Sequence, residues 1–98
     1  MAMAVPQSLP SGASPDTAGG SRHMTVIYND DHTPYEAVVE IVMRATGCGR
    51  DEAEMETWEA HHHGRAPVHF GTPRDCQDVA NVIASIGVKV EVMPEWED

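Results

Sequence analysis

The sequence predicts a small α+β domain of β-α-α-β-α-β order, with a three-stranded antiparallel sheet and helices packed on one face. Two observations predict this fold. Strand patterns lie at both ends of the folded part, at residues 24–28 and 88–92, and three helix patterns with start or stop signals lie between them. The chain has 98 residues and a mass of 10.7 kDa, which allows one domain with a modest core.

The first 23 residues are rich in Ala, Pro, Ser and Gly and have no periodic apolar face. Such a segment buries too little surface to offset the entropy of ordering, so we predict a disordered tail over 1–23 and a folded domain over 24–98. Residues 20–24 are open to a second interpretation, as a remnant of an expression vector.

The first strand, 24–28, is a short run of β-branched and aromatic residues. The next pattern predicts a helix over about 34–45, because apolar side chains recur at helical spacing. At its start Thr33 and Glu36 fit a capping box, in which each side chain accepts a hydrogen bond from the other's backbone N–H, and the intervening proline suits the first helical position. Gly47 is placed to end this helix.

The positions of Gly and Pro, and one alternation of apolar and charged residues, predict the remaining elements. Residues 50–63 contain no Gly or Pro and predict a second helix with a thin apolar face. Residues 65–70 predict a short strand, which Pro67 restricts to the sheet edge or to the strand's own first residues. Thr72 repeats the cap-plus-proline start and opens a third helix. At 88–92 valines alternate with charged residues, which is the clearest strand pattern in the chain.

Candidate binding groups gather where the first strand ends. Asn29, Asp30 and Asp31 place an amide and two carboxylates in a loop held by its flanking elements, which suits capture of a cationic or multiply donating group. The alternative is a simple turn, because these side chains hydrogen-bond their own backbone. His61 shares a helix face with Thr57 and would complete such a site; alternatively, it only complements the helix dipole.

Composition narrows the classes of function. The formal net charge of -10 leaves no basic patch for nucleic acid and favours a basic or amine-bearing partner. No apolar run is long enough for a membrane span, and two cysteines are too few for a disulfide scaffold, so we expect a cytoplasmic, monomeric protein. Adjacent residues of a helix point about 100° apart, so residues 61–63 cannot all ligate one metal. We expect no metal, no cofactor and no catalytic residues.

The sequence of the loop and of the second helix is similar to that of a known family. Residues 26–36 (VIYNDDHTPYE), followed by 51–53 and by 61–66 (HHHGRA), resemble the ClpS family of Clp protease adaptors. The pattern is N-D-D-x-T-P with H-x-x-G-K/R about thirty residues later. The resemblance extends from about residue 25 to 94.

The resemblance implies a non-catalytic adaptor that binds proteins by a bulky hydrophobic N-terminal residue (an N-degron: Leu, Phe, Tyr or Trp) and hands them to the N-terminal domain of a Clp AAA+ unfoldase for proteolysis. The residues implied to hold the free amine and first peptide bond are Asn29, Asp30, Asp31, Thr33 and His61. Those implied to line the side-chain pocket are Tyr35, Val38, Thr57, Ala60 and Val88. In this role His61 is a neutral acceptor, so binding should weaken at acidic pH.

The chain departs from the family at two pocket positions. Tyr35 and Thr57 stand where family members commonly carry methionine, and the smaller side chain of Thr57 suggests that N-terminal Ile or Val is also admitted. The positions that dock the unfoldase cannot be mapped from the sequence. One alternative remains open: residues 83–92 are similar to the C-terminal domain of the ribosomal stalk protein, which would make the chain a protein-protein interaction module without N-degron binding.

Overall fold

The computed structural model describes residues 22–96, so the predicted tail lies almost wholly outside the described residues. The elements follow the predicted β-α-α-β-α-β order. They are β2 (His23–Tyr28), α1 (Tyr35–Thr46), α2 (Arg50–His63), β3 (Arg65–Gly71), α3 (Pro73–Ala84) and β4 (Val90–Pro94). The first strand includes His23, one residue before the predicted start of the domain.

The sheet has three antiparallel strands in the order β3-β2-β4, which confirms the predicted sheet. β2 lies in the centre of this sheet, and its residues are accordingly the most completely buried of any strand. Pro67 lies in the edge strand β3, as its missing N–H requires. The register between β2 and β3 shifts between Thr25 and Val26, beside this proline.

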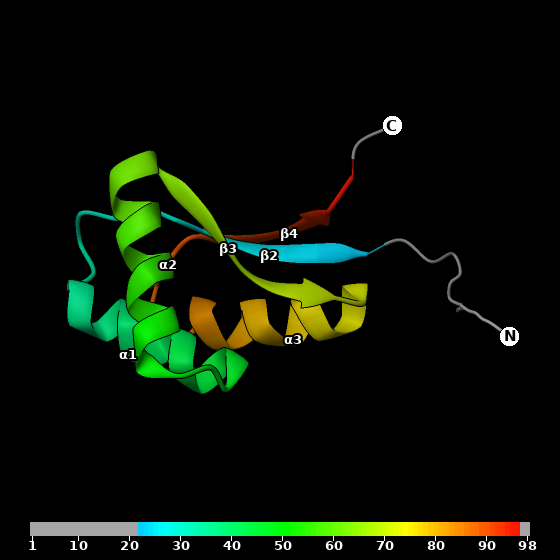
Figure 1. Ribbon diagram of the computed structural model, residues 1–98, viewed down its shortest axis with the longest axis horizontal. Helices are drawn as coiled ribbons and strands as arrows, with labels where there is room; N and C mark the ends of the chain where they lie inside the picture. The colour runs from blue at the N-terminus through cyan, green and yellow to red at the C-terminus, as the bar shows by residue number, and fades with distance from the viewer. Residues whose placement is uncertain (1–21, 97–98) are drawn as a thin grey trace, which may run out of the picture.

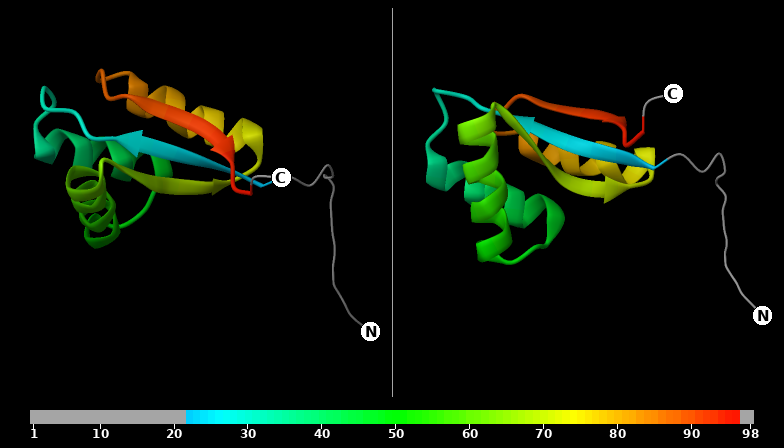
Figure 2. Two further views of the ribbon diagram at one scale, coloured as in Figure 1. Left: turned by 90° about the horizontal axis from the view of Figure 1, so that it is seen from above. Right: turned by 45° about the horizontal axis from the view of Figure 1, so that its top comes forward.

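Figure 1 shows α1 and α3 on the same side of the sheet, whereas α2 stands upright at the end where β3 begins. The views of Figure 2 agree, and α2 is seen end-on beside β3 in the left panel. The buried cluster joins Ile27 of β2 to side chains of all three helices, including Val39, Val42 and Ile83, each at most 1% exposed. Packing against this core fixes where α1 and α2 stand, and these two helices frame the site described below.

The predicted capping box at the start of α1 is wrong. No side chain caps this helix, and its N-cap residue is Pro34. The Thr33 hydroxyl instead donates to Asp30 Oδ2 at 2.7 Å, while Glu36 forms an ion pair with Arg50. The charge-assisted hydrogen bond to Asp30 orients the Thr33 side chain toward the loop, and the ion pair orients Glu36 toward α2, so neither side chain caps the helix. The second predicted cap is confirmed, because the Asp75 N–H donates to Thr72 Oγ1 at 3.0 Å.

The last strand lies two residues later than predicted. The pattern over 88–92 correctly predicted an inward face, since Val88 is buried and Lys89 exposed. However, these two residues belong to the loop that connects α3 to β4. This loop turns at Gly87, which has a φ of 92°. Lys89 still joins the sheet edge, because its carbonyl accepts the Tyr28 N–H at 3.0 Å.

The thin apolar face predicted for α2 is confirmed, since its buried residues are only Ala53, Thr57 and Ala60. Glu56, beside them, is half-buried, and its Oε1 has no hydrogen-bond partner within residues 22–96. Burial, and then the negative charges of Glu52 and Glu59, raise the pKa of Glu56 to about 7. The folded state therefore holds a proton at this position more tightly than the unfolded chain does.

Glu56→Gln should consequently stabilise the protein at pH 8 and have less effect near pH 5. Because the pKa of Glu56 is raised on folding, its ionisation opposes folding above about pH 7, and this cost is relieved as pH falls toward 4.5. Urea unfolding at pH 8, 6.5 and 5 measures the difference between variant and wild type, with Glu40→Gln as an exposed control. An equal shift at all three pH values would contradict the assignment.

Candidate functional site

The loop between β2 and α1 is fixed against the end of α2. The Asn29 N–H donates to the Gly64 carbonyl at 2.9 Å, directly beyond the last β2–β3 pair, Tyr28 with Arg65. Gly64 ends α2 with a φ of 93°, a conformation that disfavours any side chain, and this lets the chain turn at once into β3. The turn places His61, on the last turn of α2, beside the loop.

Asp30 organises the loop. Its Oδ1 accepts the His32 N–H and its Oδ2 accepts the Thr33 hydroxyl, both at 2.7 Å. These two hydrogen bonds, that from the His32 N–H first, hold the pKa of the Asp30 carboxyl below its usual value. The simple-turn interpretation is therefore correct for Asp30, which also supplies a permanent negative charge at neutral pH.

Three other polar side chains at this loop form no hydrogen bond or ion pair within residues 22–96. The Asn29 amide and the Asp31 carboxylate are exposed and form no side-chain hydrogen bond or ion pair within the described part of the chain. The His61 ring makes edge contacts with Tyr35, at 6.4 Å between centroids, and with His62, at 5.3 Å, but likewise forms no hydrogen bond there. All three can accept hydrogen bonds from a ligand.

These side chains surround one cavity of about 200 Å³. It is lined by Ile27, Tyr28, Asn29, Asp30, Asp31, Thr33, Tyr35, Val38, Thr57, Ala60 and His61. Every predicted site residue except Val88 is in this lining; Val88 is 3% exposed in the core. Ile27 and Tyr28 were not predicted as lining residues, although their place at the end of the strand that enters the loop could have indicated it.

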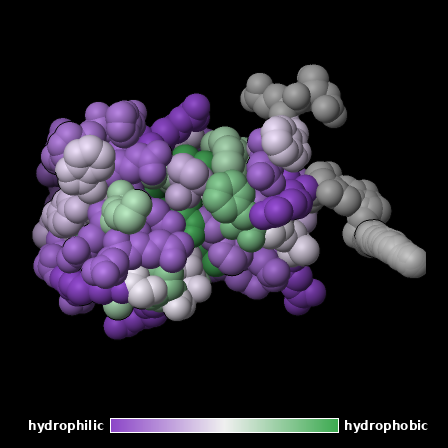
Figure 3. Space-filling view, viewed as in Figure 1, coloured by the Kyte–Doolittle hydropathy of each residue, from purple (hydrophilic) through white to green (hydrophobic). Residues whose placement is uncertain are grey.

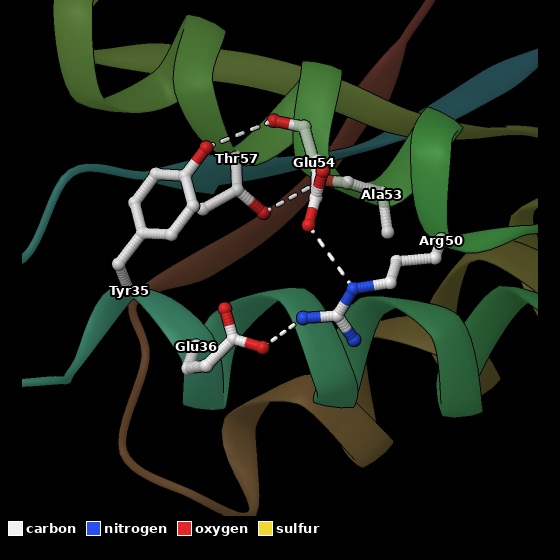
Figure 4. A network of polar contacts seen from close by, with 6 residues as sticks. All are labelled: Tyr35, Glu36, Arg50, Ala53, Glu54 and Thr57. Atoms are coloured by element: carbon white, nitrogen blue, oxygen red, sulfur yellow. Dashed lines mark hydrogen bonds and ion pairs between the residues drawn. The ribbon is translucent and has the colours of Figure 1, made fainter.

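The cavity is polar at its rim and apolar at its floor. Val38, Thr57 and Ala60 are at most 9% exposed, whereas the acceptors of the rim are open to solvent. The Thr57 hydroxyl donates to the Ala53 carbonyl of its own helix at 2.8 Å. Figure 4 shows that this turns the hydroxyl toward Ala53 and the methyl group toward the Tyr35 ring. Thr57 therefore contributes an apolar surface to the floor.

Tyr35 forms the wall between α1 and α2. Its hydroxyl donates to the Glu54 carbonyl at 3.1 Å, so the ring spans the space between the two helices (Figure 4). The helices are also joined by Arg50, which pairs with Glu36 of α1 and, at 3.1 Å, with Glu54. The pair with Glu36 joins the two helices, whereas the pair with Glu54 lies within α2, and such exposed pairs contribute about 0.2–1 kcal/mol each.

Two other kinds of site are absent from residues 22–96. No group of three or more His, Cys, Asp or Glu side chains there could hold a metal ion. None of the helices in this part of the chain has the length and apolar character needed to cross a membrane.

The fold places a half-polar cavity between two helices, an arrangement typical of small ligand-binding domains. Residues 19–90 match the family described as ATP-dependent Clp protease adaptor protein ClpS. The chain belongs to the ClpS family, a family of adaptors rather than enzymes. This membership decides against the ribosomal-stalk alternative.

Two proteins and one solved structure are similar to the chain. The chain is 40% identical over 50 residues to the ClpS adapter of Parvibaculum lavamentivorans, covering 51% of this chain and 46% of that protein. It is 32% identical over 73 residues to human E3 ubiquitin-protein ligase UBR1, covering 74% of this chain but only 4% of the ligase. Agrobacterium tumefaciens ClpS2 bound to L-phenylalaninamide has the same fold, with a TM-score of 0.73 at 21% identity, covering 76% of this chain and 98% of that one.

Proposed function

We propose that this protein is an adaptor that binds substrate proteins by a free N-terminal bulky hydrophobic residue and delivers them to a Clp AAA+ unfoldase and protease. The observation that carries the proposal is the cavity, in which unpaired acceptors at the rim stand over an apolar floor. An α-ammonium group presents three donors and one positive charge, and a hydrophobic side chain follows on the adjacent carbon. The two halves of the cavity match these two features.

Each rim residue has a role in this proposal. Asn29 and His61 accept hydrogen bonds from the ammonium group, and the charges of Asp30 and Asp31 favour it electrostatically. Thr33 holds Asp30 in place. The amine accordingly contributes most to specificity, because a site built to bind donors strongly rejects a ligand that lacks them.

The floor sets the side-chain preference. An engineered apolar cavity of roughly 150 Å³ is large enough to bind benzene. The cavity here, about 200 Å³ including its polar rim, is thus large enough for a branched aliphatic or a benzyl side chain. Support for the same ligand class comes from the ligand of Agrobacterium ClpS2, an amide with a free amine and a benzyl group. We propose Leu and Phe as the preferred residues, with Ile and Val admitted over Thr57.

Delivery implies a second partner, the N-terminal domain of the unfoldase. We further propose that the adaptor works as a cytoplasmic monomer without metal or cofactor, and that it has no affinity for nucleic acid or membranes, because its net charge of -10 repels both phosphate and anionic lipid.

Fluorescence anisotropy of peptides that differ only in their first residue tests the proposal. Peptides beginning with Phe or Leu should bind at least about tenfold more tightly than those beginning with Ala, since they bury about three or more additional carbon atoms. They should also bind more tightly than those beginning with Met, whose unbranched side chain loses more rotamer freedom on binding. N-acetylation of the Phe peptide should abolish binding, because it removes the charge and two of the three donors. Equal binding of the free and acetylated peptides would refute the proposed function.

A further inference from the structure

The open face of the sheet carries a row of large hydrophobic side chains. Met24 of β2 pairs with Phe70 of β3 on one side and with Met93 of β4 on the other. Directly paired residues of antiparallel strands lie on the same face of a sheet, so these three side chains form one row from edge to edge. Phe70 is 42% exposed. We call Met24, Phe70 and Met93 the outer row.

The helices identify which face this is. Thr25 donates to the Cys76 carbonyl of α3 at 2.9 Å, and Ile27 lies in the core shared with the helices. Because successive side chains of a strand point to opposite faces, Met24 and Val26 point away from that core. Figures 1 and 2 show α1 and α3 on the other side of the sheet and α2 at the end where β3 begins. No helix within residues 22–96 therefore covers the outer row.

The residues of β2 are those of a strand that is covered on both faces. Its outward residues are Met24, Val26 and Tyr28, and none of them is charged. A strand whose outer face meets water normally alternates apolar with polar residues. Figure 3 shows hydrophobic side chains gathered in a band over the sheet, right of centre, among hydrophilic neighbours. A contiguous exposed apolar surface of this kind is typical of a contact surface.

The chain enters the fold beside the outer row. The Arg22 guanidinium lies over the Phe70 ring, 5.9 Å from its centroid, and pairs with Glu95 at 3.2 Å. The Arg22 carbonyl also accepts the Glu95 N–H at 2.8 Å. These contacts fix the point at which residues 1–21, which lie outside the described residues, join the sheet. The segment therefore starts next to the outer row.

Residues 1–21 divide into two parts by composition. Residues 1–10 (MAMAVPQSLP) have no charged side chain and are mostly apolar, whereas residues 11–21 (SGASPDTAGGS) are small and mostly polar. A Gly/Ser-rich segment of the latter length spans about 17–20 Å on average, and the outer row is about 10 Å long. Residues 1–10 thus reach the row, at an effective concentration on the order of millimolar.

We infer that residues 1–10 pack on the outer row and cover the open face of the sheet. Their composition predicts that they do not fold alone, and the row supplies the apolar surface that they lack. A second copy is a poorer occupant, because two chains of net charge -10 repel one another, whereas residues 1–10 have no charged side chain. The cavity lies by Tyr28, at the opposite end of β2, so this contact is independent of the proposed function.

Methionine oxidation in the full chain tests the inference. Wild type is compared with a variant that keeps the length of the segment but not its apolar side chains, Met3→Ser with Val5→Ser and Leu9→Ser. Both proteins are exposed briefly to dilute hydrogen peroxide, and peptide mass spectrometry gives the rate of sulfoxide formation at each methionine. Met24 and Met93 should oxidise about threefold faster in the variant, the ratio expected if residues 1–10 cover the row for about two-thirds of the time.

Two other methionines are internal controls. Met43 and Met55 lie on α1 and α2, away from the outer row, and each should oxidise at the same rate in both proteins. Gln7→Ser with Asp16→Asn is the matched control variant, because it changes polar side chains of the same segment. This control should keep the wild-type rates throughout the outer row.

Equal rates at Met24 and Met93 in wild type and in the Met3→Ser, Val5→Ser, Leu9→Ser variant would overturn the inference, because residues 1–10 would then not cover the row. Protection that increases with protein concentration would also overturn it, since the occupant would then be a second copy. Anisotropy with a Phe peptide should give the same affinity for both proteins. Failure of the inference therefore leaves the proposed function as it stands.

Discussion

His61→Ala is expected to weaken binding of a Leu or Phe peptide by about 10- to 100-fold, the loss typical of one hydrogen bond to a charged group. His61 lines the cavity at its rim, and its imidazole forms no hydrogen bond within residues 22–96 that the substitution would break. Stability should therefore change little. Asn29→Ala should have an effect of similar size, because the backbone N–H that fixes the loop remains. Anisotropy gives the affinity, and urea unfolding verifies the fold.

His61→Gln keeps a hydrogen-bond acceptor at this position, so it should recover part of the affinity that His61→Ala loses. His62→Ala is the neighbouring control, since His62 does not line the cavity. If His62→Ala weakens binding of a Leu-Ala-Ala peptide as much as His61→Ala does, His61 is not the acceptor.

The fold was largely predictable because its signals are local. Gly47 and Gly64 end α1 and α2 in the left-handed conformation that only glycine adopts readily, and the alternation at 88–92 correctly predicted the inward face of the last strand. The prediction of the capping box was wrong because both of its side chains bond to other residues. Thr33 and Glu36 match a capping box in sequence, but Asp30 and Arg50 attract them more strongly.

The sequence predicted most of the residues that line the cavity but not how its walls are formed. The loop acceptors and His61 carry recognisable chemistry, and the turn at Gly64 brings them together. The sequence could not show that Tyr35 reaches the Glu54 carbonyl, because that contact depends on how α1 and α2 cross. For the same reason Val88 was expected in the pocket, whereas the structure places it in the core beneath the helices.

Thr57→Met should convert the adaptor from one that accepts N-terminal Ile and Val to one that rejects them by about tenfold or more, while Leu and Phe lose less. Thr57 is 4% exposed and presents its methyl group to the cavity, since its hydroxyl is bound to the Ala53 carbonyl. A methionine would extend into the space of about 200 Å³ that the ligand needs. A side chain branched at Cβ is widest where it enters and cannot bend away, whereas Leu and Phe branch one carbon later and can rotate past the new group. Anisotropy with Val, Ile, Leu and Phe peptides measures the change.

Thr57→Val is the matched control for this substitution, because it keeps the branched shape and replaces only the hydroxyl by a methyl group. That hydroxyl bonds to its own helix rather than to the cavity, so the variant should retain the wild-type order of peptide affinities. The ratio of Ile to Leu affinity is the decisive quantity, since it cancels any general loss caused by strain on α2. A ratio that is the same in wild type, Thr57→Val and Thr57→Met would show that the floor at Thr57 does not set the preference. The selectivity would then have to come from the Tyr35 wall, which faces the same space from α1.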